Sequence, residues 1–326
     1  MRSQSSTAYA VLFCCLFHVI DNNFNSCNNL YMDNYISISR TKSMKAILSI
    51  LVIVAHLARF SPYYSFPRIN LFGEMAVAGF YFLSGYGLSI SLSSKQNKLL
   101  KDFFVRIIKL IIPLILSAFL YLYFDGEFYL LWFSRQLLFL YATFYMAIWK
   151  TRKINGDTLL YTLLAYFIGM VLVFIFALGN QFAVSSQGFI MGVIWYMYGN
   201  KIKNTKFFNA IGLLSILLIA ILIIPDYESK TVMLIIRNVF SVLFVIAMVF
   251  FMQSNILNCK FMVWLGNYSY GIILVQLLIF ELFIPDNPIV YTLGIVVITI
   301  LSGIVFQMIT NTITNGLMNL FSNKKV

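Results

Sequence analysis

The sequence predicts an all-α membrane protein with about ten transmembrane helices and both termini in the cytoplasm. The chain has 326 residues, of which 61% are hydrophobic and only 10% are charged. Apolar runs of about twenty residues, the length that an α-helix needs to cross a bilayer, recur along it. The net charge of +12 comes largely from Lys and Arg in the short links between these runs. Such a distribution indicates membrane orientation, and we expect no nucleic-acid partner.

Residues 1–43 differ from the rest and form an N-terminal extension with a basic approach to the first helix. Their apolar run is too short to span a bilayer, and an Asn-rich stretch, Asp21–Asn34, follows it. We expect residues 1–31 to be dispensable, with Met32 or Met44 as the functional start. A cleaved signal peptide and an interfacial helix are the alternatives, although no clear small-x-small cleavage site is present.

Residues 44–326 form the membrane domain, in which every link between apolar segments is short. Basic residues gather before the first segment and after every even-numbered one, whereas the other links hold few of them. By the positive-inside rule, the basic links and both termini are cytoplasmic. The ten segments are approximately 44–60, 71–93, 105–124, 129–148, 158–178, 184–200, 207–225, 231–252, 261–284 and 289–316.

Ionisable side chains inside the predicted helices all fall in the outward half of the membrane. Because charges within a bilayer are costly, they usually face a cavity or a partner. We therefore expect an outward-opening polar pocket lined by the first, second, fourth, eighth and ninth segments. For individual members the alternatives are a packed histidine, interfacial snorkelling of the long side chains, or neutralisation of Arg59 or Arg135 by Glu74. The group comprises His56, Arg59, Glu74, Arg135, Arg237 and Glu281, with Gln276 as a polar companion.

Metal and nucleotide motifs are missing from the sequence. The cysteines have neither metal-ligand spacing nor a disulfide pattern. There is no nucleotide-binding glycine loop and no HExxH motif. We expect no metal and no tightly bound cofactor. The four cysteines are Cys14, Cys15, Cys27 and Cys259.

One stretch at the start of the membrane domain organises the chain. Its first part, KAILSILVIVAH (Lys45–His56), is an apolar helix with a cation at one end and a histidine near the other. These two side chains fall on nearly the same helix face, about 16 Å apart along the axis. Its second part, GFYFLSGYG (Gly79–Gly87), has a small-residue break at Ser84-Gly85, which indicates either close helix packing or a functional motif.

The pattern of a basic residue, ten residues and then His resembles the signature of the integral-membrane acyltransferase 3 family. Three further segments are similar to motifs of that family, in the same order, so the resemblance runs from about Lys45 to the C-terminus. The sequence departs from the family where Lys45 and Lys109 replace arginines and Gln276 replaces a histidine. The three segments are FYFLSGYGL (Phe80–Leu88), FFVRIIKLIIP (Phe103–Pro113) and LGNYSYGIILVQ (Leu265–Gln276).

The resemblance implies a membrane O-acyltransferase of the bacterial cytoplasmic (inner) membrane. Such an enzyme takes an acyl group, commonly acetyl, from cytoplasmic acyl-CoA, here acetyl-CoA as co-substrate, and transfers it to a hydroxyl of a surface or lipid-linked carbohydrate. The resemblance also implies that His56 is the catalytic base, because an imidazole accepts a proton near neutrality. Glu74, at a similar depth on the neighbouring helix, is our own candidate for orienting that ring.

Basic residues at the cytoplasmic side are the candidates for holding the donor. Lys45, Arg106 and Lys109 have the charge to bind the phosphates of a coenzyme A thioester. For Arg106 and Lys109 the alternative is an ordinary positive-inside role.

On the outward side, Arg135 and Arg237 are candidates to bind the acceptor or to stabilise an oxyanion. Arg59, Gln276 and Glu281 are further candidates for substrate contacts. Two other functions stay open at this point. A carrier or flippase for a lipid-linked glycan would use the same polar cavity but would need no acyl-CoA contacts. A non-catalytic relative is the other, because Gln276 cannot act as an acid or base.

Overall fold

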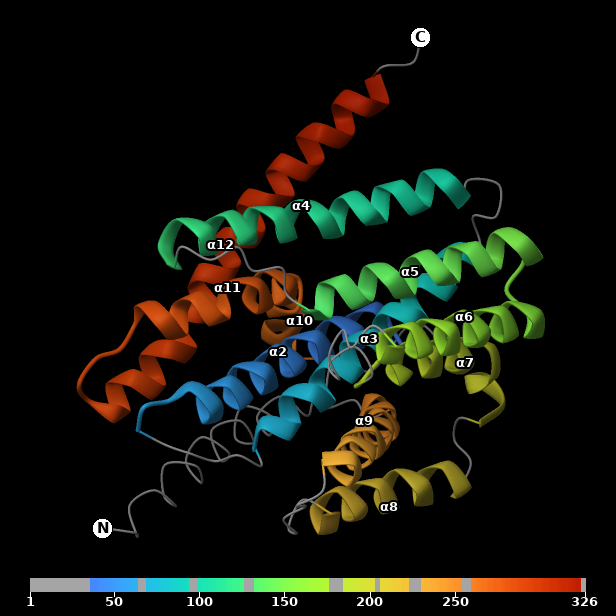
Figure 1. Ribbon diagram of the computed structural model, residues 1–326, viewed down its shortest axis with the longest axis horizontal. Helices are drawn as coiled ribbons and strands as arrows, with labels where there is room; N and C mark the ends of the chain where they lie inside the picture. Colours follow the sequence, from blue (N-terminus) through green and yellow to red (C-terminus); the bar gives the residue numbers. More distant parts are fainter. Residues whose placement is uncertain are drawn as a thin grey trace.

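The computed structural model describes residues 36–63, 69–93, 99–125, 132–175, 184–202, 206–222, 230–253 and 259–323. Every regular element in these ranges is a helix (Figure 1), so the predicted all-α class is confirmed. Residues 1–35 of the N-terminal extension, including the predicted start at Met32, lie outside the described residues.

The described helices correspond to the predicted segments, but α2 and α4 begin six residues earlier than predicted, α12 ends seven residues later, and the segment 261–284 is interrupted. Five helices are long and apolar enough to cross a membrane, namely Ile38–Phe60, Leu71–Ser93, Leu99–Phe124, Val232–Met252 and Pro288–Asn319. Ten crossings and cytoplasmic termini stay predictions. The bounds are α2 Ile38–Phe60, α3 Asn70–Ser93, α4 Leu99–Asp125, α5 Trp132–Thr151, α6 Gly156–Ile175, α7 Gln187–Ile202, α8 Lys206–Leu222, α9 Lys230–Met252, α10 Lys260–Leu265, α11 Ser269–Leu282 and α12 Pro288–Asn323.

Local sequence explains where two of the helices begin. Before α2, the Ser37 hydroxyl accepts a hydrogen bond from the backbone N–H of Arg40 at 3.3 Å. Before α12, Asn287 Oδ1 accepts from the N–H groups of Ile289 and Val290 at 2.9 and 3.2 Å. Pro288 occupies the first position of α12, where a missing N–H removes no helical hydrogen bond. Both starts therefore have an ordinary side-chain cap.

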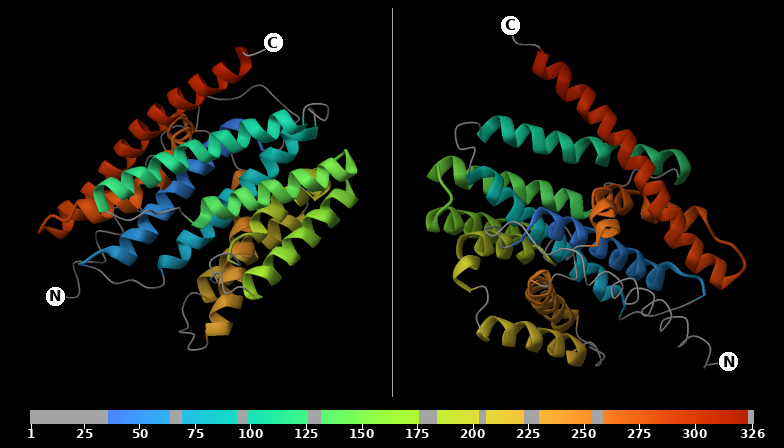
Figure 2. Two further views of the ribbon diagram at one scale, coloured as in Figure 1. Left: turned by 45° about the horizontal axis from the view of Figure 1, so that its top comes forward. Right: turned by 180° about the vertical axis from the view of Figure 1, so that it is seen from behind.

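The helices are arranged around α2 and α3, which run through the middle of the bundle (Figures 1 and 2). Helices α5, α6 and α7 lie on one side, and α8 packs on α9, which itself packs on α3. Helices α10, α11 and α12 pack on the other side of α2, where α12 also crosses α4. The largest buried cluster joins α2, α3, α5, α7 and α9, and a second joins α2 with α10, α11 and α12.

Helix α3 packs tightly on α7 through glycines of both helices. A Cβ atom at Gly85 would lie only 2.2 Å from the carbonyl oxygen of Phe189, and one at Gly192 would lie 2.2 Å from that of Phe82. Small residues allow two helix backbones to approach this closely in a membrane. The predicted break at Ser84-Gly85 is wrong, because α3 runs through these residues without interruption. Close helix packing is therefore one role of this small-residue pair.

The prediction of a single helix at 261–284 is wrong in one respect, because the helix is interrupted between α10 and α11. A Cβ atom at Gly266 would lie 1.9 Å from the carbonyl oxygen of Lys42 on α2. The break therefore occurs where this segment touches the α2 backbone. Hydrophobic periodicity within one segment contains no information on such a distant contact.

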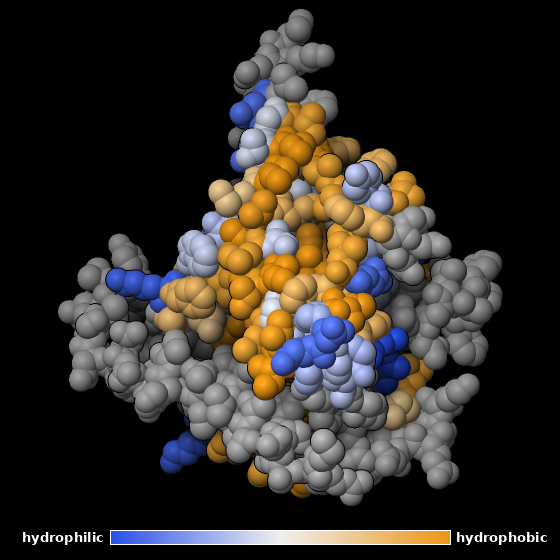
Figure 3. All heavy atoms as spheres, turned by 90° about the vertical axis from the view of Figure 1, so that its left-hand side faces the viewer, coloured by the Kyte–Doolittle hydropathy of each residue, from blue (hydrophilic) through white to orange (hydrophobic). Residues whose placement is uncertain are grey.

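The outer surface beside α12 is hydrophobic, as Figure 3 shows for the face where this helix projects toward the C-terminus. Large apolar side chains such as Leu301 and Val305 are exposed there. Exposed apolar surface of this extent indicates contact with a membrane. A groove of about 740 Å³ between α4 and α12 is almost entirely apolar and is lined by Leu116, Phe119, Leu120, Leu122, Tyr123, Phe306, Ile309 and Thr310.

Candidate active site

His56 lies one turn before the end of α2, between aromatic rings. Its ring centroid is 5.6 Å from that of Phe60 and 6.4 Å from that of Phe280 on α11, both edge-to-face. Its Nδ1 atom is buried and has no hydrogen-bond partner in the part of the chain that the structure describes. The imidazole therefore packs between apolar rings, and its Nδ1 atom is available for a further contact.

Gln276 is the polar side chain that interacts with the His56 ring. Only 2% of Gln276 is exposed, and its Oε1 atom, like His56 Nδ1, is buried without a hydrogen-bond partner among the described residues. The two side chains therefore approach each other but do not form a hydrogen bond of ordinary geometry. The structure thus brings together two residues that the sequence placed in the outward half of separate helices.

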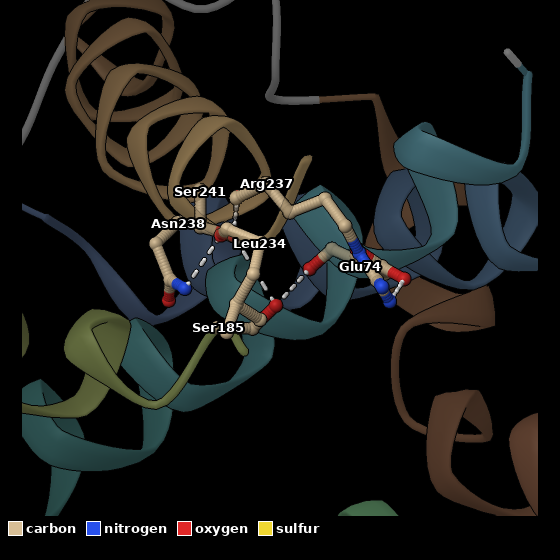
Figure 4. Close-up of polar contacts among 6 residues, drawn as sticks. All are labelled: Glu74, Ser185, Leu234, Arg237, Asn238 and Ser241. Atoms are coloured by element: carbon tan, nitrogen blue, oxygen red, sulfur yellow. Dashed lines mark hydrogen bonds and ion pairs between the residues drawn. The ribbon is translucent and has the colours of Figure 1, made fainter. Parts of the chain in front are cut away.

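Glu74 forms an ion pair with Arg237, which joins α3 to α9 (Figure 4). Arg237 Nε donates to Glu74 Oε2 at 2.6 Å, and Arg237 Nη2 donates to Oε1. Ser185, just before α7, donates its hydroxyl to the Glu74 carbonyl oxygen at 2.7 Å. The charge partner of Glu74 is thus Arg237 and not Arg59 or Arg135. Within the described residues, Glu74 makes no hydrogen bond or ion pair with the His56 ring.

Lys45 and Arg106 are close enough to interact electrostatically, together with Lys42. Arg106 Nε donates to Asp102 Oδ2 at 2.7 Å, and the Tyr145 hydroxyl donates to the same oxygen at 2.6 Å. Lys45 has no acidic partner within the described ranges. Three cations with one carboxylate leave a local excess of positive charge, which suits an anionic ligand.

The remaining candidates are exposed at or near helix ends. Lys109 is exposed on α4, one turn beyond Arg106, and Arg135 is exposed in the first turn of α5. Glu281 is exposed in the last turn of α11. Arg59 is also exposed, with its guanidinium carbon 5.3 Å from the centre of the Phe60 ring, and it acts electrostatically on His56.

Sequence reasoning missed Asp102, Tyr145 and Phe280. The Asp102–Arg106 pair had a signal, because the two residues are four positions apart on one helix. Phe280 likewise lies one turn after Gln276. The sequence contains no such signal for Tyr145, because its contact with Asp102 joins two different helices. For metals, the described residues contain no group of three or more His, Cys, Asp or Glu that could hold an ion.

A helical bundle with long apolar spans, a half-buried imidazole on α2 and a cationic cluster shared by α2 and α4 defines a multi-pass membrane protein with an internal polar site. The acyltransferase domain model of the acyltransferase 3 family matches residues 42–308. The chain therefore belongs to the acyltransferase 3 family, a family of membrane acyltransferases. No curated protein matches the chain. No solved structure matches it either.

Proposed function

We propose that this protein is a membrane O-acyltransferase that moves an acyl group, acetyl in the first instance, from cytoplasmic acyl-CoA to a hydroxyl of a surface or lipid-linked carbohydrate. The observation that carries the proposal is the arrangement of α2, which has Lys42 and Lys45 of the cationic cluster near one end and a half-buried imidazole with a buried Nδ1 near the other. The proposed location is the bacterial cytoplasmic membrane. Its partners are membrane lipid, the carbohydrate acceptor and acetyl-CoA as co-substrate, with no tightly bound cofactor.

The donor is held at the cationic cluster. Lys45 and Arg106 contact the phosphates, with Lys109 at the exposed edge, and the thioester arm runs along α2. Lys45 and His56 are separated by about 16 Å along the axis. Lysine binds phosphate as a point charge and lacks the bidentate geometry of arginine, so these contacts allow more freedom of orientation.

The reaction needs one proton acceptor, which is His56. The imidazole takes the proton of the acceptor hydroxyl while the oxygen attacks the thioester carbonyl carbon. The new C–O bond forms, the C–S bond breaks, and the imidazolium gives its proton to the departing thiolate. Coenzyme A leaves as the free thiol, and His56 returns to its neutral form. Arg135 and Arg237 are the proposed contacts of the acceptor and of the developing oxyanion, with Arg59, Gln276 and Glu281 as further candidates.

The test is coenzyme A release against acetyl-CoA concentration, in membranes with equal protein levels and supplied with candidate glycans. We expect His56→Ala to lower turnover by roughly 10²–10⁴-fold, the usual contribution of a positioned base. His56→Gln is expected to be about as inactive, because an amide cannot accept the proton. Lys45→Ala is expected mainly to raise the acetyl-CoA concentration required. Near-normal turnover by His56→Ala would remove His56 from the mechanism.

The acceptor is identified by mass analysis of surface polysaccharide with and without the protein. Acyl-sized mass differences that depend on His56 support the transferase. A wild-type protein that releases no coenzyme A, yet alters how much lipid-linked glycan reaches the outer face, would point to a carrier.

A further inference from the structure

Helices α2 and α11 run parallel and in register over the site. Ser49 Oγ on α2 contacts the carbonyl oxygen of Ser269 on α11 at 3.5 Å. Seven residues later on both helices, His56 meets Gln276. Seven residues are two helical turns, or about 10.5 Å of rise, on each helix. The approach of Gln276 to His56 is therefore a consequence of helix register and not an isolated side-chain contact.

Each of these two side chains has one unsatisfied buried polar atom. His56 Nδ1 and Gln276 Oε1 are buried without a hydrogen-bond partner among the residues that the structure describes. A buried polar atom without a partner destabilises the folded protein, so such atoms call for an explanation. A carbonyl-type oxygen only accepts hydrogen bonds. Both atoms are therefore satisfied when Nδ1 carries a proton and donates a hydrogen bond to Oε1.

The second ring nitrogen faces a different environment. His56 Nε2 forms no hydrogen bond with the described residues and, unlike Nδ1, is not a fully buried atom. It therefore reaches accessible space. The rings of Phe60 and Phe280 pack against the imidazole and offer no oxygen or nitrogen acceptor. A proton on Nδ1 would leave Nε2, the accessible nitrogen, as the proton acceptor.

We propose that Gln276 is a positioning residue for His56, whose Oε1 accepts a hydrogen bond from Nδ1–H and thereby fixes the tautomer in which Nε2 is the base. The inference rests on the proposed function, since it assigns a base nitrogen. It also gives Gln276 a role at the position where the family has a histidine. Which ring nitrogen of a histidine is available depends on the hydrogen bond that the other one makes.

The backbone of α11 is held on both sides of Gln276. The Tyr121 hydroxyl on α4 donates to the Leu274 carbonyl oxygen at 3.2 Å and accepts from the Leu278 N–H at 3.1 Å. In an uninterrupted helix these two groups pair with each other. A buried tyrosine from a third helix thus fixes the turn that carries Gln276.

The test compares three single variants in membranes. Gln276→Glu keeps an acceptor oxygen, Gln276→Met keeps the shape without one, and Leu277→Met places the same side chain at the next position as a control. At saturating acetyl-CoA we expect Gln276→Met to lose roughly 10–10³-fold in turnover, below the loss of about 10⁴-fold that a wrong tautomer causes in a catalytic triad. We expect Gln276→Glu to retain turnover within about 10-fold and Leu277→Met to match the wild type.

A second measurement reads the tautomer directly. The protein has two histidines, so ¹⁵N-histidine labelling in a His18→Gln background leaves His56 as the observed imidazole. Solid-state NMR in lipid, at a pH where an ordinary imidazole is neutral, assigns the proton to one nitrogen. We expect Nδ1–H in the wild type and in Gln276→Glu, and a mixture of tautomers in Gln276→Met.

The inference is overturned by a proton on Nε2 in the wild type, or by unchanged turnover and tautomer in Gln276→Met. It is also overturned if Gln276→Glu is inactive while Gln276→Met is active, because the amide would then be a donor. A wild-type protein that shows Nδ1–H but releases no coenzyme A would sink the proposed function alone.

Discussion

At the level of single residues, the Glu74–Arg237 pair shows how a charge is accommodated inside this bundle. The two side chains are 22% and 27% exposed, so they are neither fully buried nor freely hydrated. Removing one partner of a buried pair leaves the other charge unsatisfied, which is more costly than removing both. The contact therefore serves at least to join α3 to α9.

We expect Glu74→Gln and Arg237→Gln each to lower the unfolding temperature in detergent, and the double variant to lose less than the sum of the two. Contacting residues show coupling energies of about 0.5–3 kcal/mol in such cycles. Arg59→Gln, which removes an exposed cation, is the control with little expected effect. Additive losses would show that the pair contributes nothing. A stable double variant without acyl transfer would show that Arg237 also acts on the acceptor.

How far residues could be predicted depends on sequence distance. Lys45 and His56 stand on one predicted helix, so their shared face follows from helix geometry. Glu74 and Arg237 are 163 positions apart, and nothing in either segment specifies the other. The contact of His56 with Gln276 likewise depends on how α11 packs beside α2. Residue types and depths were accessible from the sequence, whereas the pairings required the packed bundle.

At the level of helices, the glycine contact of α3 and α7 is the most demanding packing in the bundle. The Phe189 carbonyl oxygen is rigid backbone, so a side chain at Gly85 has no space unless one helix moves. The Cβ of an alanine at Gly87, two residues later on the same helix, would meet nothing within 4 Å. The same helix therefore provides both a test and its matched control.

We expect Gly85→Ala to lower the stability of the protein by about 1–3 kcal/mol, the usual cost of overpacking, and Gly87→Ala to have little effect. Thermal unfolding of both variants in the same detergent measures the difference. Equal stability of the two variants would mean that α3 and α7 separate easily and that the close contact is not required.

Helix positions were predictable because each long apolar run must pair its own backbone groups inside a bilayer. The interruption at Gly266 was not predictable from its own segment, because it lies where the backbone meets the Lys42 carbonyl oxygen on another helix. The start of α12 at Pro288 lies one residue before its predicted position, whereas α2 and α4 begin six residues earlier than predicted.

For the whole molecule, orientation follows from charge. Lys150, Arg152 and Lys153 follow α5, and Asp286 lies in the link between α11 and α12. Basic links remain in the cytoplasm during insertion, whereas acidic links have little influence. The charge pattern therefore predicts that these two links lie on opposite sides of the membrane.

We expect a reporter fused after Lys153 to be active in the cytoplasm and one fused after Asp286 to be active outside it. Alkaline phosphatase and a cytoplasmic fluorescent protein, fused at both positions, provide reciprocal readouts. If both reporters were active on the same side of the membrane, the predicted topology would be wrong, including the number of crossings between the two positions.

The contact of Gly266 with Lys42 has a consequence for both ends of the site. Under the proposed function, helix α2 carries the cations that face the donor and the imidazole that faces the acceptor, while the segment after Gly266 carries the amide beside that imidazole. Because the two backbones touch at this point, sliding one past the other would misalign the amide and disturb the cationic end in the same movement. Gly266 is therefore a common fixed point, far from the reacting atoms, on which the spacing of the whole transfer path depends.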